Sequence, residues 1–167
     1  LSRAHFDASI AASGRQVVSA RLRSPTFGGG SWLAHSELLS GLDMHDPNAY
    51  RLLLKTQRPT LVQHFAANGY RTVGWLPGIQ RAWPEGRFYG FDRIADADAI
   101  GYRGPAFGYW RIPDHAAMAQ LQHQELNDAD GTDGAARQPR LVVFPTMSTH
   151  APFRPLAPYV SDWAAVR

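Results

Sequence analysis

The chain has 167 residues, of which 44% are hydrophobic and 19% are charged, a composition typical of one globular domain with a sizeable core. Its 17 Lys and Arg against 14 Asp and Glu favour an anionic partner, but they lack the clustering of a nucleic-acid-binding protein. The absence of cysteine excludes disulfides, thiolate metal sites and cysteine nucleophiles. No apolar run approaches the roughly 20 residues that cross a bilayer. Since the chain begins at Leu1 without Met, we expect it to be an internal part of a longer protein.

The first part of the chain predicts helices separated by glycine and proline signals. Apolar and small residues at helical spacing predict a helix over 3–13, and β-branched residues predict a strand over 16–23. A second helix is expected over 32–40. Asp46 and Pro47 are typical of the start of a third helix.

The remaining elements alternate between helix and strand. A predicted helix over 61–68 passes directly into a short apolar strand over 70–76, which is half of a β-α-β unit. The segment 79–110 is irregular and rich in aromatic residues, so it is either a binding segment or an aromatic cluster that pins a loop. A helix begins at Pro113 and Asp114, and the apolar run 141–144 predicts a buried strand. Together these elements predict an α/β fold with a mostly parallel sheet flanked by helices.

Three consecutive glycines lead to Ser31 and a helical pattern, and this stretch is the first candidate site. Glycine permits backbone conformations that bring Ser31 to a helix N-terminus, where N–H groups and the helix dipole favour phosphate or sulfate. The alternative is a flexible turn whose serine caps the helix. The spacing excludes a G-x-S-x-G nucleophile elbow, a phosphate-binding P-loop and a dinucleotide fingerprint.

Two histidines are candidates for binding the same anion. His35 lies one helical turn after Ser31 and contacts the substrate anion or is an ordinary polar helix residue. His150 follows the predicted strand 141–144, at the edge of the sheet where ligands gather, and its alternative is a structural histidine. We expect Ser31 and His150 to lie at the same edge of the sheet.

Two acidic groups are interpreted as structural. Asp43, His45 and Asp46 resemble metal ligands in composition, but they lie in a turn between helices, where Asp commonly caps. Asp114 follows a proline at a helix start and is interpreted as an N-cap beside His115.

The order of the motifs resembles a known family. These motifs are Ser-Pro-Thr-Phe-Gly-Gly-Gly-Ser-Trp-Leu-Ala-His, Trp83-Pro84-Glu85-Gly86 with Tyr89-Gly90-Phe91-Asp92, Tyr102-Arg103-Gly104-Pro105, and Ser148-Thr149-His150-Ala151-Pro152-Phe153. They are similar to the sulfatase-like branch of the alkaline phosphatase superfamily, and within it to bacterial membrane proteins related to lipoteichoic acid synthase and other phosphoglycerol transferases. The resemblance covers nearly the whole chain. It implies that residues 1–167 are the central part of a single sulfatase-like catalytic domain.

The resemblance implies roles for four residues. Ser31 matches the metal-bound Ser or Thr nucleophile, and His150 matches a histidine that contacts the substrate anion. Trp83 falls near a pocket-lining Trp, and Arg87 is the candidate for a substrate-binding Arg. His35 is assigned to the substrate from its spacing after Ser31. The implied cofactor is a divalent metal ion, Mn or Mg rather than Ca or Zn, whose ligands other than Ser31 lie outside this chain.

Two departures from the family bear on function. Formylglycine-dependent sulfatases need Pro or Ala two residues after the nucleophile and Arg four residues after it, whereas Leu33 and His35 stand there. The family's early acidic metal ligand and late Asp-His pair are both missing, so we expect the chain to be inactive alone and active as part of an intact enzyme.

The expected activity is phosphoglycerol-type transfer, or hydrolysis, of a phosphodiester or sulfate ester through Ser31. The alternatives are a formylglycine-independent sulfatase-like hydrolase and a non-catalytic domain that binds an anionic glycan or lipid headgroup. No nucleic-acid partner is expected. The resemblance also implies a bacterial inner-membrane protein whose domain faces the periplasm or the outside, anchored by segments beyond this chain.

Overall fold

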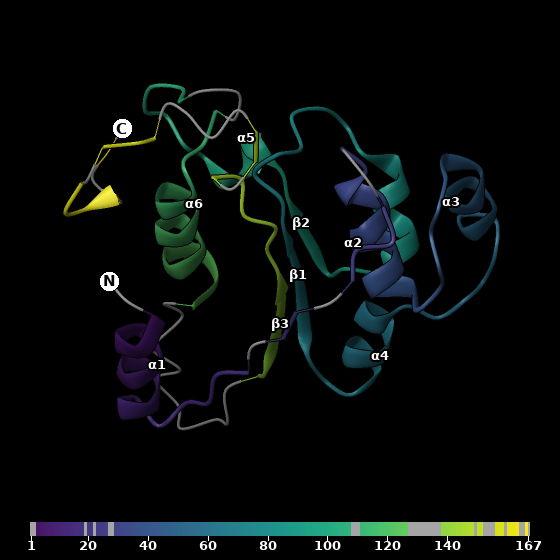
Figure 1. Cartoon of the computed structure of the whole chain (residues 1–167), viewed down its shortest axis with the longest axis horizontal. Coiled ribbons are helices and arrows are strands. Elements are labelled where there is room, and N and C mark those ends of the chain that lie inside the picture. The colour runs from purple at the N-terminus through teal and green to yellow at the C-terminus, as the bar shows by residue number, and fades with distance from the viewer. Residues whose placement is uncertain are drawn as a thin grey trace.

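Three short strands form one parallel sheet at the centre of the molecule (Figure 1). They are β1 (Arg71–Trp75), β2 (Arg93–Ala95) and β3 (Arg140–Val143), in the order β2-β1-β3, and β1 runs parallel to both neighbours. The predicted α/β fold with a parallel sheet is confirmed. The computed structural model describes residues 3–18, 20–21, 23–26, 29–107, 111–126, 138–148, 150–151, 156–158, 160–163 and 166.

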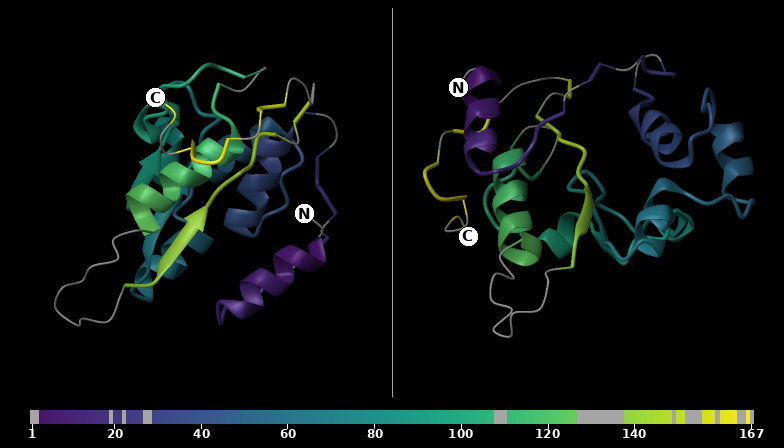
Figure 2. Two further views of the ribbon diagram at one scale, coloured as in Figure 1. Left: turned by 90° about the vertical axis from the view of Figure 1, so that its left-hand side faces the viewer. Right: turned by 90° about the horizontal axis from the view of Figure 1, so that it is seen from below.

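Helices flank both faces of the sheet, as the views from two further directions show (Figure 2). One side carries α6, and the other carries α2 and α4, with α3 outside them. Most of the predicted helices are confirmed within one or two residues. The helical elements are α1 (Arg3–Ala12), α2 (Ser31–Ser40), α3 (Pro47–Leu53), α4 (Leu61–Ala67), the 3-10 turn η1 (Pro84–Tyr89), α5 (Ala97–Ile100), α6 (Asp114–Leu121) and the π-helical turn η2 (Gln122–Leu126).

The sheet separates two apolar clusters, because successive side chains of a strand point to opposite faces. Val73 and Trp75 of β1 are fully buried and pack with Ala117 of α6 in one cluster. The Trp75 indole N–H donates to the Ala117 carbonyl at 2.9 Å, so its only polar group is satisfied. On the other face, Leu39 of α2 and Val62 of α4 are buried together. Burial of each such side chain contributes about 1.5–3 kcal/mol, so both helix layers are needed.

Side chains cap the starts of α3 and α4. The Asp46 carboxylate accepts the Asn48 N–H at 2.6 Å and the Ala49 N–H at 3.2 Å, which confirms its interpretation as the N-cap of α3. Thr60 forms a capping box with Gln63 at the start of α4.

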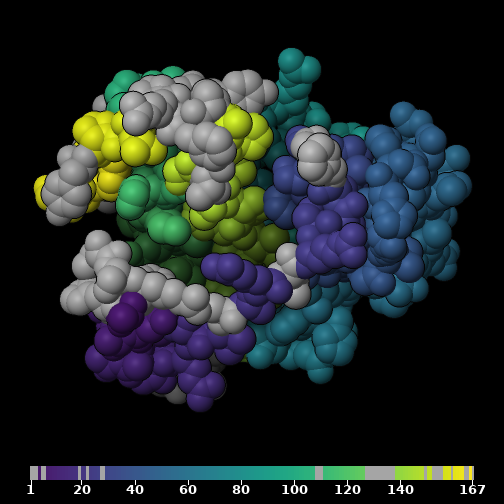
Figure 3. Space-filling view, viewed as in Figure 1, coloured from purple at the N-terminus to yellow at the C-terminus, as the bar shows by residue number. Residues whose placement is uncertain are grey.

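Three predictions differ from the structure. No strand is present in the described part of 16–23, because Val18 is 91% exposed and the sheet does not extend to it. The irregular segment 79–110 contains β2, which is too short to show an alternating pattern. The predicted strand 141–144 is β3, but it is half-buried because it lies at the edge of the described sheet. Its residues are visible between those of α6 and α2 in Figure 3.

Candidate functional site

A cavity of about 790 Å³ lies beside the carboxyl ends of β1 and β3. Its wall combines one face of α2, the segment that follows β1, part of η1, and the loop that leaves β3. The carboxyl edge is where ligands bind in open α/β sheets. The sequence-predicted candidates Ser31, His35 and Trp83 all line this cavity.

Ser31 is exposed at the cavity wall and is the first residue of α2. The preceding Gly29 has a φ of +75°, and a Cβ on Gly30 would lie 3.0 Å from the Cβ of Thr26, so the turn depends on both glycines. Gly30 is the N-cap, and therefore the alternative that Ser31 caps the helix is wrong. No side chain caps α2, and the Leu33 N–H already donates to the Gly30 carbonyl at 2.9 Å, so the Ser31 and Trp32 N–H groups are the ones that the helix leaves available to an anion.

His35 lies one turn after Ser31 and also lines the cavity. His35 is exposed, but desolvation of its imidazole lowers the pKa of the ring from 6.5, so the neutral form predominates at neutral pH. A neutral imidazole offers one N–H donor and one acceptor nitrogen. His35 can therefore donate a hydrogen bond to a substrate oxygen next to the Ser31 hydroxyl.

A chain of aromatic and hydroxyl groups supports the first turn of α2. The buried Tyr89 hydroxyl donates to Ser36 Oγ at 2.8 Å, and Ser36 Oγ donates to the Trp32 carbonyl at 2.9 Å. Trp83 stacks on Tyr89, with the ring centroids 5.6 Å apart. Burial raises the pKa of Tyr50, the neighbouring Tyr89 hydroxyl adds to this rise, and a hydrogen bond with Trp83 opposes it. The phenols therefore stay protonated and act as fixed hydrogen-bonding groups.

The loop that leaves β3 is tied to the first residue of α6. The Asp114 carboxylate accepts the Met147 N–H at 2.7 Å, the Ser148 N–H at 2.9 Å and the Ser148 hydroxyl. The interpretation of Asp114 as an N-cap is wrong, because Pro113 has that position and the carboxylate bonds the loop instead. Met147, held in this way, lines the cavity.

Two other predicted residues lie outside the cavity lining. Arg87 is exposed near the end of η1, and the cavity is lined instead by Arg81 and Glu85. His150 is exposed and follows the lining residue Met147 by three positions. Its backbone N–H donates to the Met147 carbonyl at 3.0 Å. Their roles in substrate binding stay predictions.

The described residues do not form a metal site. No group of three or more His, Asp and Glu side chains among them is placed to hold an ion. The exposed Asp43 and His45 pair with each other, with Oδ2 and Nε2 2.7 Å apart, as expected for a turn outside the cavity. A divalent ion needs several fixed donors, and Ser31 offers one hydroxyl, so the donors present do not fit the metal by themselves.

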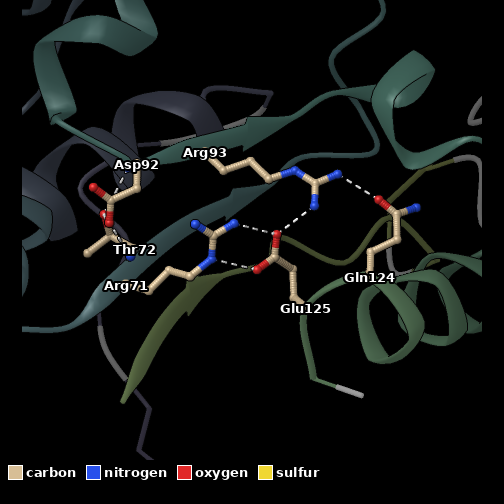
Figure 4. A network of polar contacts seen from close by, with 6 residues as sticks. All are labelled: Arg71, Thr72, Asp92, Arg93, Gln124 and Glu125. Carbon is tan, nitrogen blue, oxygen red and sulfur yellow. Dashed lines mark hydrogen bonds and ion pairs between the residues drawn. The ribbon is translucent and has the colours of Figure 1, made fainter. Parts of the chain in front are cut away.

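A buried carboxylate lies at the other end of the sheet (Figure 4). Glu125 is 1% exposed and binds Arg71 at 2.9 Å and 3.1 Å and Arg93 at 2.6 Å. Burial alone would raise the pKa of Glu125, but the hydrogen bonds and charges of the two arginines outweigh it and hold that pKa below 4.5. These groups bind one another and do not line the cavity.

Sequence reasoning missed several groups at the cavity. Tyr50 and Arg81 carry no motif that points to a site, and Tyr89 stands in a quoted motif without an assigned role, because aromatic residues in an irregular segment are compatible with packing alone. The signal available was the density of aromatic residues in 79–110 itself.

The part of the chain that the structure describes holds no helix long and apolar enough to span a bilayer.

The fold and the cavity define an α/β protein with a serine and a histidine at the carboxyl edge of a parallel sheet. No protein-family model matches the chain, and no curated protein matches it. Among solved structures, it is similar to a protein in the alkaline phosphatase superfamily from Vibrio parahaemolyticus, with 21% identity and a TM-score of 0.45. The match covers 77% of this chain and 32% of that protein, so the chain spans about a third of that protein's length.

Proposed function

We propose that this chain is part of an enzyme that transfers or hydrolyses phosphate or sulfate esters, with Ser31 as the nucleophile. The observation that carries the proposal is the exposed Ser31 hydroxyl at the N-terminus of α2, on the wall of a cavity of about 790 Å³ that His35 and Trp83 also line. The motif resemblance supports the sulfatase-like, phosphoglycerol-transferase branch. A phosphodiester is the favoured substrate, because Leu33 and His35 stand where formylglycine sulfatases have Pro or Ala and Arg.

The proposed chemistry is an in-line displacement. Ser31 Oγ gives up its proton to solvent and forms a bond to phosphorus as the bond from phosphorus to the departing alkoxide breaks, and the alkoxide takes up a proton to leave as the alcohol. The covalent intermediate is a seryl phosphodiester that keeps the second alcohol of the substrate. The first N–H groups of α2 and the His35 N–H donate to the oxygens on which negative charge develops. Water or an acceptor hydroxyl then attacks phosphorus and restores Ser31.

A divalent metal belongs to the proposed enzyme as a prediction of the resemblance. Such an ion would lower the pKa of the nucleophile and neutralise the phosphate oxygens. Of the residues described, only Ser31 is assigned to it, and no step above depends on it. The remaining ligands would come from the rest of the intact protein.

The competing proposal is a non-catalytic domain that holds an anionic glycan or lipid headgroup in the same cavity. The lack of a three-residue metal cluster in the described residues is the observation in its favour. We expect the intact protein to release nitrophenol from bis(nitrophenyl) phosphate faster than from nitrophenyl phosphate or nitrophenyl sulfate, with a requirement for Mn²⁺ or Mg²⁺. Binding of a phosphodiester without any turnover in either metal would support the non-catalytic domain.

A further inference from the structure

Asp114 is buried, although nothing in the proposed chemistry requires it. Its residue is 6% exposed, and its carboxylate accepts hydrogen bonds from two backbone N–H groups and one hydroxyl of the loop that leaves β3. Burial of a carboxylate is costly unless hydrogen bonds replace its hydration. Here the donors lie 33 and 34 residues away along the chain, so the contact joins two separate elements.

The loop held by Asp114 is part of the cavity wall. Pro145 and Met147 line the cavity, and the donors to Asp114 are Met147 itself and its neighbour Ser148. The Met147 carbonyl accepts the His150 N–H at 3.0 Å, so the anchored turn continues to His150. Hydrogen bonds to an ionised carboxylate are about twice as strong as those between neutral groups. The Asp114 side chain therefore ties this wall to the start of α6.

We propose that Asp114 is a positioning residue, which fixes the loop 145–148 at the carboxyl end of β3 and through it the part of the wall that Pro145 and Met147 contribute to the cavity lined by Ser31. The expected effect of Asp114 on turnover rests on the proposed function. Its expected effect on the loop rests on the hydrogen bonds alone. Asp114 itself does not line the cavity. Its action is exerted through Met147 and Ser148.

The first test is amide hydrogen exchange in the intact protein, compared between wild type, Asp114→Asn and Asp92→Asn. Asp92 is the matched control, because its carboxylate accepts the Thr72 N–H at 2.7 Å and the Thr72 hydroxyl at 3.0 Å, and neither residue lines the cavity, although the neighbouring Phe91 does. In Asp114→Asn, we expect exchange at Met147 and Ser148 at least about tenfold faster, because the amide offers one acceptor oxygen and places an NH₂ group against a donor. Exchange in α2 and β1 should stay as in wild type. Unchanged exchange at Met147 and Ser148 would overturn the proposal.

The second test is turnover of a phosphodiester by the same variants. We expect kcat/KM to fall on the order of 10-fold to 100-fold in Asp114→Asn and to stay at the wild-type value in Asp92→Asn, because small displacements of a site wall cost that much. Ser148→Ala removes one of the three hydrogen bonds and should give smaller changes in the same direction. Faster loop exchange with wild-type kcat/KM in Asp114→Asn would overturn the positioning role while the proposed function stands.

Two further outcomes separate the hypotheses. If wild type turns over no ester in either metal, the proposed function fails, and the exchange rates alone decide whether Asp114 anchors the loop. If Asp114→Asn loses exchange protection throughout β1, it has lost its fold, and Ser148→Ala then decides. Unchanged exchange at Met147 in Ser148→Ala would in that case overturn the proposal.

Discussion

The polar side chains at the two ends of the parallel sheet differ in their partners and in their exposure. At the amino end, Arg71 and Arg93 are the first residues of β1 and β2, and both bind the buried Glu125 (Figure 4). At the carboxyl end, Ser31 and His35 line an open cavity, and both are exposed. The charged side chains at the amino end bind one another, whereas the hydroxyl and imidazole groups at the carboxyl end can bind a ligand.

This difference separates residues that stabilise the fold from residues that are available to a ligand. Buried ions that satisfy one another have no remaining capacity for a substrate, so their loss should affect stability alone. Exposed groups on a cavity wall contribute little to stability, so their loss should affect activity alone. Each variant below tests one side of this separation.

The largest effect on activity is expected at Ser31. Ser31→Ala should abolish turnover in the intact enzyme, because alanine lacks the nucleophilic oxygen, and Ser31→Thr should keep part of it because the hydroxyl remains on a β-branched side chain. Steady-state kinetics with a phosphodiester measures both. The melting temperature of Ser31→Ala should stay near that of wild type.

A matched control for Ser31 is Ser13→Ala, which removes another exposed hydroxyl, one that donates to the Ile10 carbonyl in α1. It should leave kcat/KM unchanged. Near-normal turnover in Ser31→Ala would make Ser31 an ordinary surface residue and would move the nucleophile elsewhere.

The largest effect on stability is expected at Glu125. Glu125→Ala leaves Arg71 and Arg93 without their shared carboxylate. Because the side chains of the two arginines are 35% and 30% exposed, water partly replaces the carboxylate, and the loss should be about 1.5–3 kcal/mol. Urea denaturation measures this free energy of unfolding. Asp98→Ala, which breaks an exposed contact with Arg111 at 3.5 Å, should change stability little. A similar loss in both variants would contradict the distinction between buried and exposed charge.

The same network predicts a dependence of stability on pH. The folded pKa of Glu125 lies below its ordinary value of 4.5, so its contribution is fully present above that value and is lost as the pH falls through the lowered folded pKa. Wild type should therefore lose more stability than Glu125→Gln between neutral and strongly acidic pH. Parallel curves for the two proteins, from urea denaturation at several pH values, would show that the pKa of Glu125 does not change on folding.

His150 tests how far the functional edge extends beyond the cavity wall. If His150 contacts the substrate anion, as the resemblance implies, His150→Ala should lower kcat on the order of 10²–10³-fold, the cost of removing one contact to developing charge. His115→Ala, at an exposed position of α6, is the control and should have no effect. An unchanged kcat in His150→Ala would confine the site to the described cavity.

The smallest effect is expected at Tyr89. Tyr89→Phe removes the hydroxyl that donates to Ser36 at 2.8 Å but keeps the ring that stacks on Trp83, so about 1 kcal/mol of stability should be lost. Calorimetry should show a melting temperature lower by about 2–4 °C. A loss several times larger would indicate that this hydroxyl holds α2 in place by itself.

Much of the fold could be predicted from local signals. Asp46 and Thr60 cap helices as their positions suggested, because capping depends on a few neighbouring residues. The strand β2 could not be predicted, since three residues carry no period and their pairing with β1 is set by the tertiary fold. The exposed Val18 shows the converse, because β-branched residues form a strand only beside a partner.

The candidate site was predicted in part. Ser31, His35 and Trp83 line one cavity, and the glycine turn before a helix that points to Ser31 is a local feature of the sequence. The roles of the three residues stay predictions. The role of Asp114 could not be read from the sequence, because its partners Met147 and Ser148 are far along the chain and donate mainly through backbone N–H groups. Every residue except proline has a backbone N–H, so the residue types at 147 and 148 do not reveal that they donate to Asp114.

The most direct test of the central claim is to trap the covalent intermediate. The intact protein is mixed with a phosphodiester, quenched in acid within one turnover and digested with trypsin, which places Ser31 in the peptide 24–51. The account predicts a phosphoryl adduct that fragmentation assigns to Ser31 and that is absent from Ser31→Ala. Turnover with an adduct on another residue, or on Ser24, Ser36 or Ser40 of the same peptide, would contradict it.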